Sequence, residues 1–325
     1  MQVAEWRLLQ RLPTLSLSQL NTDFEALIHN KQGSAQLYQK LIERCTELSW
    51  NSEENDVGKS VELMAKVKAG EVKGQFYAKT LQKVMEMVRK GPGDRAARLV
   101  VAYAAEGVES AALYQLANTA LKPAAAQLAP DLAVKLANWL APYLQSLPEA
   151  STFYPELEAI PLQSPAQAVS MLQGFVKAHK GSYAFLSSIS ARILSEQHAL
   201  SGQLQSAAIH YICKSGLQDA SIFAALETMA EQLDLTLMIG NAFDLASAGY
   251  QPHRLLSIVK ARAYELEDVR DLISLQWVYQ LGGESLPKEL ETVKSFLLLR
   301  GLHVSSYLLG RRLSTLSLSQ QPHQH

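Results

Sequence analysis

The sequence predicts an all-α protein, a multi-helix array of antiparallel helical hairpins. Apolar residues recur every three or four positions in segment after segment, most segments end at Gly or Pro, and strand-like alternation is rare. We count about fifteen such segments, most of them roughly 10–18 residues long, which is ordinary helix length. The hairpins are expected to form either a degenerate α-solenoid or a two-lobed helical bundle, with the solenoid slightly favoured.

In the segment 72–90, apolar side chains follow one another at steps of four, three and four, in the order Tyr77, Leu81, Val84 and Val88. This spacing places them on one face of a helix, while lysines and glutamate occupy the rest of its surface. Gly91-Pro92-Gly93 predicts the end of the helix, because Gly tolerates a left-handed φ and Pro cannot continue the helix.

Two later segments carry a cap residue as well as an apolar face. Ser164 and Pro165 predict the start of a helix over 164–178, since Ser caps the first amides and Pro suits the first turn. Its apolar face consists of Ala168, Met171, Leu172 and Phe175. Asp219 predicts the cap of a helix over 219–233, whose apolar face consists of Ile222, Leu226, Met229 and Leu233.

Short connections between these segments predict hairpins. Glycines lie at or near the expected helix ends, at Gly107, Gly181, Gly216, Gly249 and Gly282-Gly283. Short links between helices favour antiparallel neighbours. From about residue 200 to 265 the segments succeed one another without a long break, as stacked helical repeats do, although no tetratricopeptide, ankyrin or armadillo consensus is present.

One boundary interrupts the array. A single helix cannot accommodate the four prolines of this stretch, which are Pro148, Pro155, Pro161 and Pro165. We therefore expect an N-terminal helical half over 1–147, a Pro-rich joint over 148–161, a C-terminal helical half over 162–315 and a tail over 316–325. A rigid internal loop within one continuous array is the alternative.

The two ends of the chain carry nearly the same nine residues. Arg11 to Gln19 reads RLPTLSLSQ, and Arg312 to Gln320 reads RLSTLSLSQ. The Thr-Leu-Ser-Leu-Ser part alternates with period two, which is the clearest strand-like pattern in the chain. One hypothesis is that the copies pair as a small ribbon or dock on equivalent sites of the two halves. The alternative is coincidence, with Ser18 capping the next helix and the later copy forming part of a tail.

Charge and cysteine content exclude several classes of function. The formal net charge is −1, so no overall field attracts nucleic acid or an anionic membrane. Cys45 and Cys213 stand alone and not in a CxxC pair, which favours a reducing compartment. The first residues carry charges where a signal peptide needs an apolar run, and no uncharged span of about 20 residues exists for a bilayer. We therefore expect a soluble cytoplasmic protein without a membrane span.

Two short motifs are similar to ligand sites. Gly58-Lys59-Ser60 matches the end of a P-loop, but Glu53 stands where the first Gly is required, and a helix-start loop is expected. Glu267 to Asp271 (EDVRD) resembles the aspartate-rich motif of class I prenyl and terpene synthases, which implies Mg²⁺ bound to a diphosphate. Acids favoured by the helix dipole in a first turn explain the same residues without a ligand. We expect no cofactor and no metal site.

The local charge pattern is the strongest functional indication. Between Lys59 and Arg98 there are ten Lys and Arg against four Asp and Glu, a net charge of +6. The predicted basic patch consists of Lys66, Lys68, Lys73, Lys79, Lys83, Arg89, Lys90, Arg95 and Arg98. Spread over two or three neighbouring helices, it suits an acidic protein segment or a phosphate backbone. The alternative is an ordinary solvated lysine-rich surface.

These observations predict a function in binding and not in catalysis. The leading hypothesis is a non-catalytic helical scaffold or adaptor subunit that binds one or more proteins, acidic partners among them. Nucleic-acid binding through residues 59–98 is the second hypothesis. A Mg²⁺-dependent, diphosphate-handling all-helical enzyme is the third.

Overall fold

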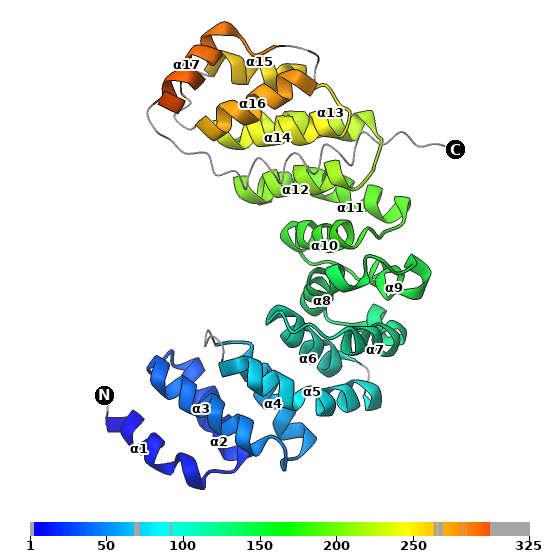
Figure 1. Cartoon of the computed structure of the whole chain (residues 1–325). Helices are drawn as coiled ribbons and strands as arrows, with labels where there is room; N and C mark the ends of the chain where they lie inside the picture. The colour runs from blue at the N-terminus through cyan, green and yellow to red at the C-terminus, as the bar shows by residue number, and fades with distance from the viewer. Residues whose placement is uncertain are drawn as a thin grey trace. The chain divides into compact units, whose positions relative to one another are not determined.

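The computed structural model describes residues 3–67, 72–91, 93–262, 265, 269–281, 283 and 285–299. Over these residues the chain folds into seventeen α-helices joined by turns and short 3-10 helices, and contains no β-strand (Figure 1). The predicted all-α fold class is therefore confirmed. None of the described helices is both long and apolar enough to cross a membrane.

The chain divides into two compact units. Unit 1 contains the residues up to Pro161 together with residues 177–181. Unit 2 contains Leu162–Val176 and the residues from Ser182 onward. The chain thus first passes from unit 1 to unit 2 after Pro161, the last residue of the Pro-rich segment 148–161.

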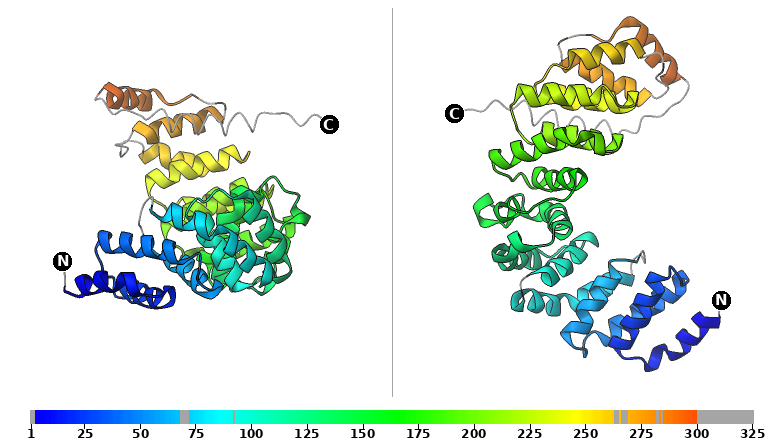
Figure 2. Two further views of the ribbon diagram at one scale, coloured as in Figure 1. Left: turned by 60° about the horizontal axis from the view of Figure 1, so that its bottom comes forward. Right: turned by 180° about the vertical axis from the view of Figure 1, so that it is seen from behind.

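Unit 1 contains two rows of helices. One row consists of α2 (Leu17–His29), α4 (Glu54–Met64), α6 (Asp94–Ala105) and α8 (Pro130–Leu144), each packed against the next. The other row consists of α3 (Ala35–Leu48), α5 (Val72–Lys90) and α7 (Ala111–Leu121). The short α1 (Val3–Arg11) packs against α3, and α9 (Tyr154–Leu157) packs against the 3-10 turn after α7. Helices of the two rows pair as hairpins, α2 with α3, α4 with α5 and α6 with α7 (Figures 1 and 2).

Unit 2 has the same plan. One row consists of α12 (Gly202–Lys214), α14 (Leu235–Ser247) and α16 (Val269–Leu281), and the other of α11 (Tyr183–Ser195), α13 (Ala220–Ala230) and α15 (His253–Arg262). The last described helix, α17 (Lys288–Leu299), packs against α16. Residues 165–176 of α10 (Pro165–Ala178) also belong to this unit, where the ring centroid of Phe175 lies 4.5 Å from that of Phe185 in α11.

The helical pairs recur at nearly constant spacing in each unit. In unit 1, the row helices α2, α4, α6 and α8 begin at residues 17, 54, 94 and 130, so the starts are 36–40 residues apart. In unit 2, the alternate helices α10, α12, α14 and α16 begin at residues 165, 202, 235 and 269, which are 33–37 residues apart. Each unit is therefore built from pairs of similar length, and neighbouring pairs cover one another's apolar faces.

The three helices argued from spacing have the expected faces. In α5, which ends at Lys90, Tyr77, Val84 and Val88 are buried and Leu81 is half-buried. At the start of α10, the predicted cap is confirmed because the Ser164 hydroxyl accepts from the Gln167 amide at 3.2 Å.

The Asp219 carboxylate caps α13, since it accepts from the Ser221 and Ile222 amides at 2.8 and 3.2 Å. This helix ends at Ala230, three residues before the predicted bound, and Leu233 is buried in the turn that follows. Five of the glycines expected near helix ends have positive φ, namely Gly107, Gly181, Gly216, Gly249 and Gly283.

The Pro-rich segment 148–161 packs into unit 1. Phe153 and Tyr154 are fully buried, and the Tyr154 hydroxyl donates to the Ala137 carbonyl of α8 at 2.7 Å. The Asn118 side chain of α7 accepts from the Phe153 amide at 3.2 Å. Phe153 and Tyr154 are thus part of the core of unit 1, whereas the division into two helical halves at a Pro-rich joint stays a prediction.

The first copy of the repeated nine residues is not a strand. Leu12–Thr14 forms a 3-10 turn, only the next two residues are extended, and α2 begins at Leu17. The three leucines of this copy, Leu12, Leu15 and Leu17, are all buried. Their alternation therefore comes from a turn that enters a helix, and the strand-like interpretation is wrong.

A capping box explains the polar residues of the same copy. The Ser16 hydroxyl accepts from the Gln19 amide at 3.3 Å, and the Ser16 amide donates to the Gln19 side chain at 3.0 Å. Ser16 is thus the cap of α2, and the expectation for Ser18 is wrong. The second copy, residues 312–320, lies outside the described residues, as does the tail 316–325.

Both thiols are protected by the fold. Cys45 is fully buried, and burial raises the pKa of its thiol to about 12. Burial and the nearby Asp244 carboxylate also raise the pKa of the Cys213 thiol.

Because the thiolate is the reactive form, we expect the native protein to react with a dithiobisnitrobenzoate reagent at pH 8 at least about 100-fold more slowly than the unfolded protein. Both cysteines should titrate once guanidinium chloride unfolds the chain. A fast-reacting thiol in the native protein would contradict this burial.

Candidate functional site

The described residues of the predicted basic patch lie in the turn after α4 and in α5 and α6 of unit 1. Lys68 lies outside the described residues. Of the eight patch residues that the structure describes, five bind groups of unit 1 itself and three are exposed with no ion pair to another described residue. Only the three exposed residues keep their positive charge available to a partner.

Lys73 forms a buried ion pair. Its Nζ lies 2.7 Å from Glu106 Oε1 at the end of α6, and its side chain is 7% exposed. The neighbouring Tyr77 is also buried, and its burial, together with the Glu106 charge, raises the pKa of the Tyr77 hydroxyl. Lys73 therefore holds α5 to the end of α6 and is not accessible to a partner.

Lys83 caps the C-terminal end of α3. Its Nζ donates to the carbonyl oxygens of Ser49, Trp50 and Ser52 at 2.8, 2.8 and 2.7 Å, in the turn that follows the helix. Carbonyls at the C-terminus of a helix lack partners within it and carry a partial negative charge, which a cation offsets. Lys83 thus has a structural role.

We expect Lys83→Met to lower the free energy of unfolding by about 1–2 kcal/mol, because three carbonyls lose a charged donor at a partly exposed site. Lys79→Met, one turn earlier on the same helix and exposed, is the matched control and should change it by less than about 0.5 kcal/mol. Urea denaturation followed by circular dichroism measures both. Equal effects would show that the three carbonyl contacts are not stabilising.

Residues of α4 partner three further members of the patch. The pairs are Lys90 with Glu54 at 2.5 Å, Arg95 with the Asn55 side chain at 2.6 Å and Arg98 with Glu62 at 3.6 Å. Exposed pairs of this kind contribute little to stability. They nevertheless place negative charge and acceptors beside the positive charge of α5 and α6, which lowers the positive potential of the surface.

Three patch residues remain exposed. Lys79 and Arg89 lie ten residues apart on α5, which is about 15 Å along the helix axis. Lys66 lies near Glu25, whose carboxyl pKa is held below its usual range chiefly by Lys59 at 2.6 Å and also by the Lys66 charge. A single basic interface over residues 59–98 therefore stays a prediction that depends on these three side chains.

The Gly-Lys-Ser sequence lies inside a helix. Because α4 begins at Glu54, Gly58 to Ser60 are helical and not part of a phosphate-binding loop, and the expected helix-start loop is wrong. Ser60 is buried, and its hydroxyl donates to the Asn21 side chain of α2 at 2.7 Å. The segment holds two neighbouring helices together.

The EDVRD segment is only partly within the described chain. Glu267 and Asp268 lie outside it. Asp271 of α16 accepts from the Thr236 hydroxyl of α14 at 2.8 Å, so it connects two neighbouring helices. Among the residues that the structure describes, no group of three or more His, Cys, Asp or Glu side chains is placed to hold a metal ion.

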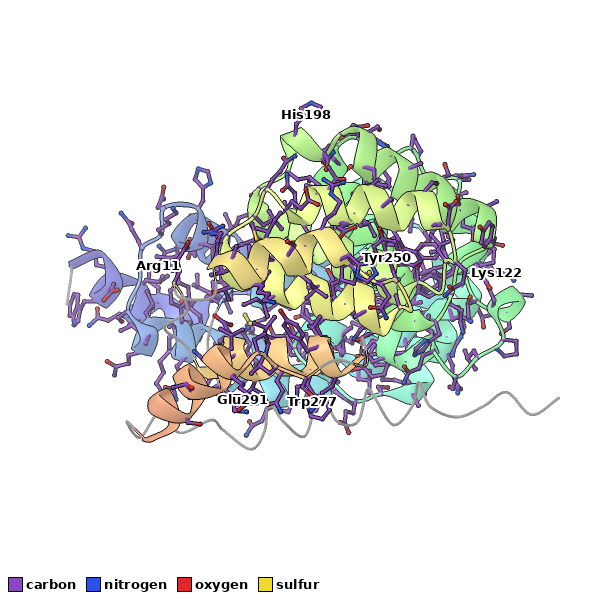
Figure 3. The ribbon with its side chains drawn as sticks, turned by 90° about the horizontal axis from the view of Figure 1, so that it is seen from above. Arg11, Lys122, His198, Tyr250, Trp277 and Glu291 are labelled. Carbon is purple, nitrogen blue, oxygen red and sulfur yellow. The ribbon has the colours of Figure 1, made fainter. Side chains whose placement is uncertain are left out.

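Glu227 of α13 is a buried carboxylate that belongs to none of the predicted motifs. It accepts from the Tyr250 hydroxyl at 2.8 Å and from the Arg254 and Leu255 amides at 2.9 and 3.1 Å. The two amides belong to the first turn of α15, where free N–H groups attract negative charge. Glu227 thus joins α13 to α15; its partner Tyr250, which precedes α15, is labelled in Figure 3.

No protein-family model matches the chain, and no curated protein is significantly similar to it.

Proposed function

We propose that this chain is a non-catalytic scaffold of stacked helical repeats that binds partner proteins. The observation that carries the proposal is the recurrence of helical pairs every 33–40 residues, with alternate helices packed in rows in each unit. Stacked helical pairs contact mainly their neighbours and expose long faces, whose residues vary without disturbing the core. Partner segments bind to such faces through apolar and charged anchors.

Hydrogen bonds between successive helices of one row of unit 2, α12, α14 and α16, support stacking in a constant register. Three polar pairs join residues that are 34 or 35 positions apart, close to the spacing of the helical pairs. They are Ser206 with Asn241 at 2.9 Å, His210 with Asp244 at 3.0 Å and Thr236 with Asp271 at 2.8 Å. Since α14 contributes to all three, it meets α12 and α16 at equivalent positions, as the middle member of a repeat array does.

Exposed aromatic side chains provide further support. Trp50 is 73% exposed in the turn after α3. Three more large aromatic side chains are exposed, namely Trp6, Trp139 and Tyr183. Trp and Tyr contribute strongly to protein–protein interfaces because they bury a large area with little loss of side-chain freedom. These four positions are the first to test.

Affinity purification of the tagged chain from its native source tests the proposal. At 0.15 M salt and after nuclease treatment, we expect at least one protein to be retained in stoichiometric amount. Replacing the exposed aromatic residues one at a time by Ala should release that protein in at least one variant without lowering the thermal midpoint. Loss of the partner on nuclease treatment would favour nucleic-acid binding instead. Failure to retain any stoichiometric protein would contradict the scaffold function.

A further inference from the structure

We propose that a groove between α1 and α2 binds an acidic, aliphatic segment of a partner protein, an inference that rests on the proposed scaffold function. The groove has a volume of about 350 Å³ and lies between α1 and the second half of α2. This volume is at the lower end of the range for binding pockets and is suited to a few side chains. Helix α1 forms one wall of the groove. Because α1 packs against α3, its position does not depend on a ligand.

A specific contact fixes the wall further. The Glu5 carboxylate of α1 accepts from the Ser34 amide at 2.6 Å. Ser34 in turn caps α3, since its hydroxyl accepts from the Leu37 amide at 3.2 Å. Glu5 is therefore engaged in holding α1 against the α2–α3 turn, and its charge is partly offset at one end of the groove.

Two arginines supply the binding charge. Arg7 and Arg11 are exposed, line the groove and lie four residues apart, so they share one side of α1 (Figure 3 labels Arg11 at its end). Within the described chain, neither guanidinium forms an ion pair or hydrogen bond. A guanidinium without an internal partner is free to bind a carboxylate through two parallel hydrogen bonds.

The other lining residues determine which groups can lie between the acidic residues of the ligand. Leu8 and Leu27 are half-buried and offer an apolar surface on which an aliphatic side chain packs. Asp23 of α2 supplies a carboxylate that accepts from a ligand amide or a basic side chain. This combination fits acidic residues on either side of a Leu, Ile or Val.

Nucleic acid fits the same lining poorly. The lining supplies only two cations, Arg7 and Arg11, whereas a phosphate backbone carries a charge on every nucleotide. The groove-lining residues include no aromatic ring, so a base has no stacking partner there. A protein segment is therefore the occupant that the charges and the apolar surface favour together.

Selection from a phage-displayed library of random twelve-residue peptides tests the assignment on the full chain. We expect enriched peptides to carry at least two acidic residues next to an aliphatic one. The affinity of the best synthetic peptide, measured by fluorescence polarisation, should fall about fivefold in Arg7→Ala and in Arg11→Ala, and about 25-fold in the double variant.

The matched control is the double variant Lys79→Ala and Arg89→Ala, which removes two exposed cations of α5 outside the groove. It should bind the peptide within about twofold of the unchanged protein, because neither side chain contacts the ligand. All variants should have the same thermal midpoint, since the replaced side chains are exposed.

Several results would overturn the assignment. They are the absence of enriched peptides, enrichment without acidic residues, and binding that the double arginine variant retains. Salt-dependent binding of a 20-nucleotide single-stranded DNA that this variant loses would make nucleic acid the occupant and would also overturn it. In the affinity purification, a partner retained by the double arginine variant would overturn the groove assignment alone, whereas no partner for the unchanged chain would overturn the scaffold function.

Discussion

Glu106→Gln is expected to lower the free energy of unfolding by about 3 kcal/mol. The change leaves the Lys73 ammonium, whose side chain is 7% exposed, without the carboxylate that lies 2.7 Å away. A buried charge without a partner costs several kcal/mol, because water cannot replace the lost interaction. We expect the lower part of that range, since Glu106 itself is 23% exposed.

The double variant Lys73→Met and Glu106→Gln separates the ion pair from packing. Because this variant also removes the Lys73 ammonium, its free energy of unfolding should be within about 1 kcal/mol of the value for the unchanged protein. Urea denaturation of the two single variants and the double variant measures the coupling between the two sites. If Glu106→Gln and the double variant lose the same free energy, the buried charge is not the cause.

Glu227→Ala is expected to cost about 2–3 kcal/mol in unit 2. It removes the acceptor of one hydroxyl and two backbone amides, and the amides lie in the first turn of α15. Amide hydrogen exchange over residues 253–262 should accelerate more than exchange elsewhere in unit 2, because α15 loses its cap. Denaturation and hydrogen exchange together therefore measure the global and the local effect.

Glu227→Gln is the matched variant for this site. Its amide oxygen still accepts hydrogen bonds, so we expect about half of the loss seen with Ala. An equal loss in both variants would mean that the negative charge, and not the hydrogen bonds, stabilises α15. A loss below about 0.5 kcal/mol in Glu227→Ala would contradict the role of this carboxylate.

The helices themselves could be predicted from the sequence because their signals are local. The spacing of Tyr77, Val84 and Val88 along α5 and the Asp219 cap of α13 depend only on neighbouring residues. The period-two alternation in the first copy of the repeated residues is local as well, but a turn followed by a helix produces the same pattern as a strand. A short pattern of this kind is therefore ambiguous.

A count of charges along the chain could not predict which residues of the basic patch have internal partners. Glu54 lies outside the counted segment, and Glu62 neutralises Arg98, 36 positions later, only after α4 has packed against α6. Charge per segment ignores such tertiary partners. The groove between α1 and α2 is likewise a product of tertiary packing.

Two buried charges did leave a signal in the sequence. Lys73 lies four residues before Tyr77 and so continues the apolar stripe of α5. Glu227 lies four residues after the buried Phe223 and three before the buried Ala230. A charged residue at a core position of a helical pattern indicates a buried partner, although the pattern does not say which one.

The central proposal, that the chain acts by binding other proteins, is tested most directly by native mass spectrometry of the assembly isolated from its native source. We predict an assembly whose mass equals that of this chain plus at least one different protein, and which persists after nuclease treatment. A mass equal to this chain alone, or to whole multiples of it, would contradict the proposal.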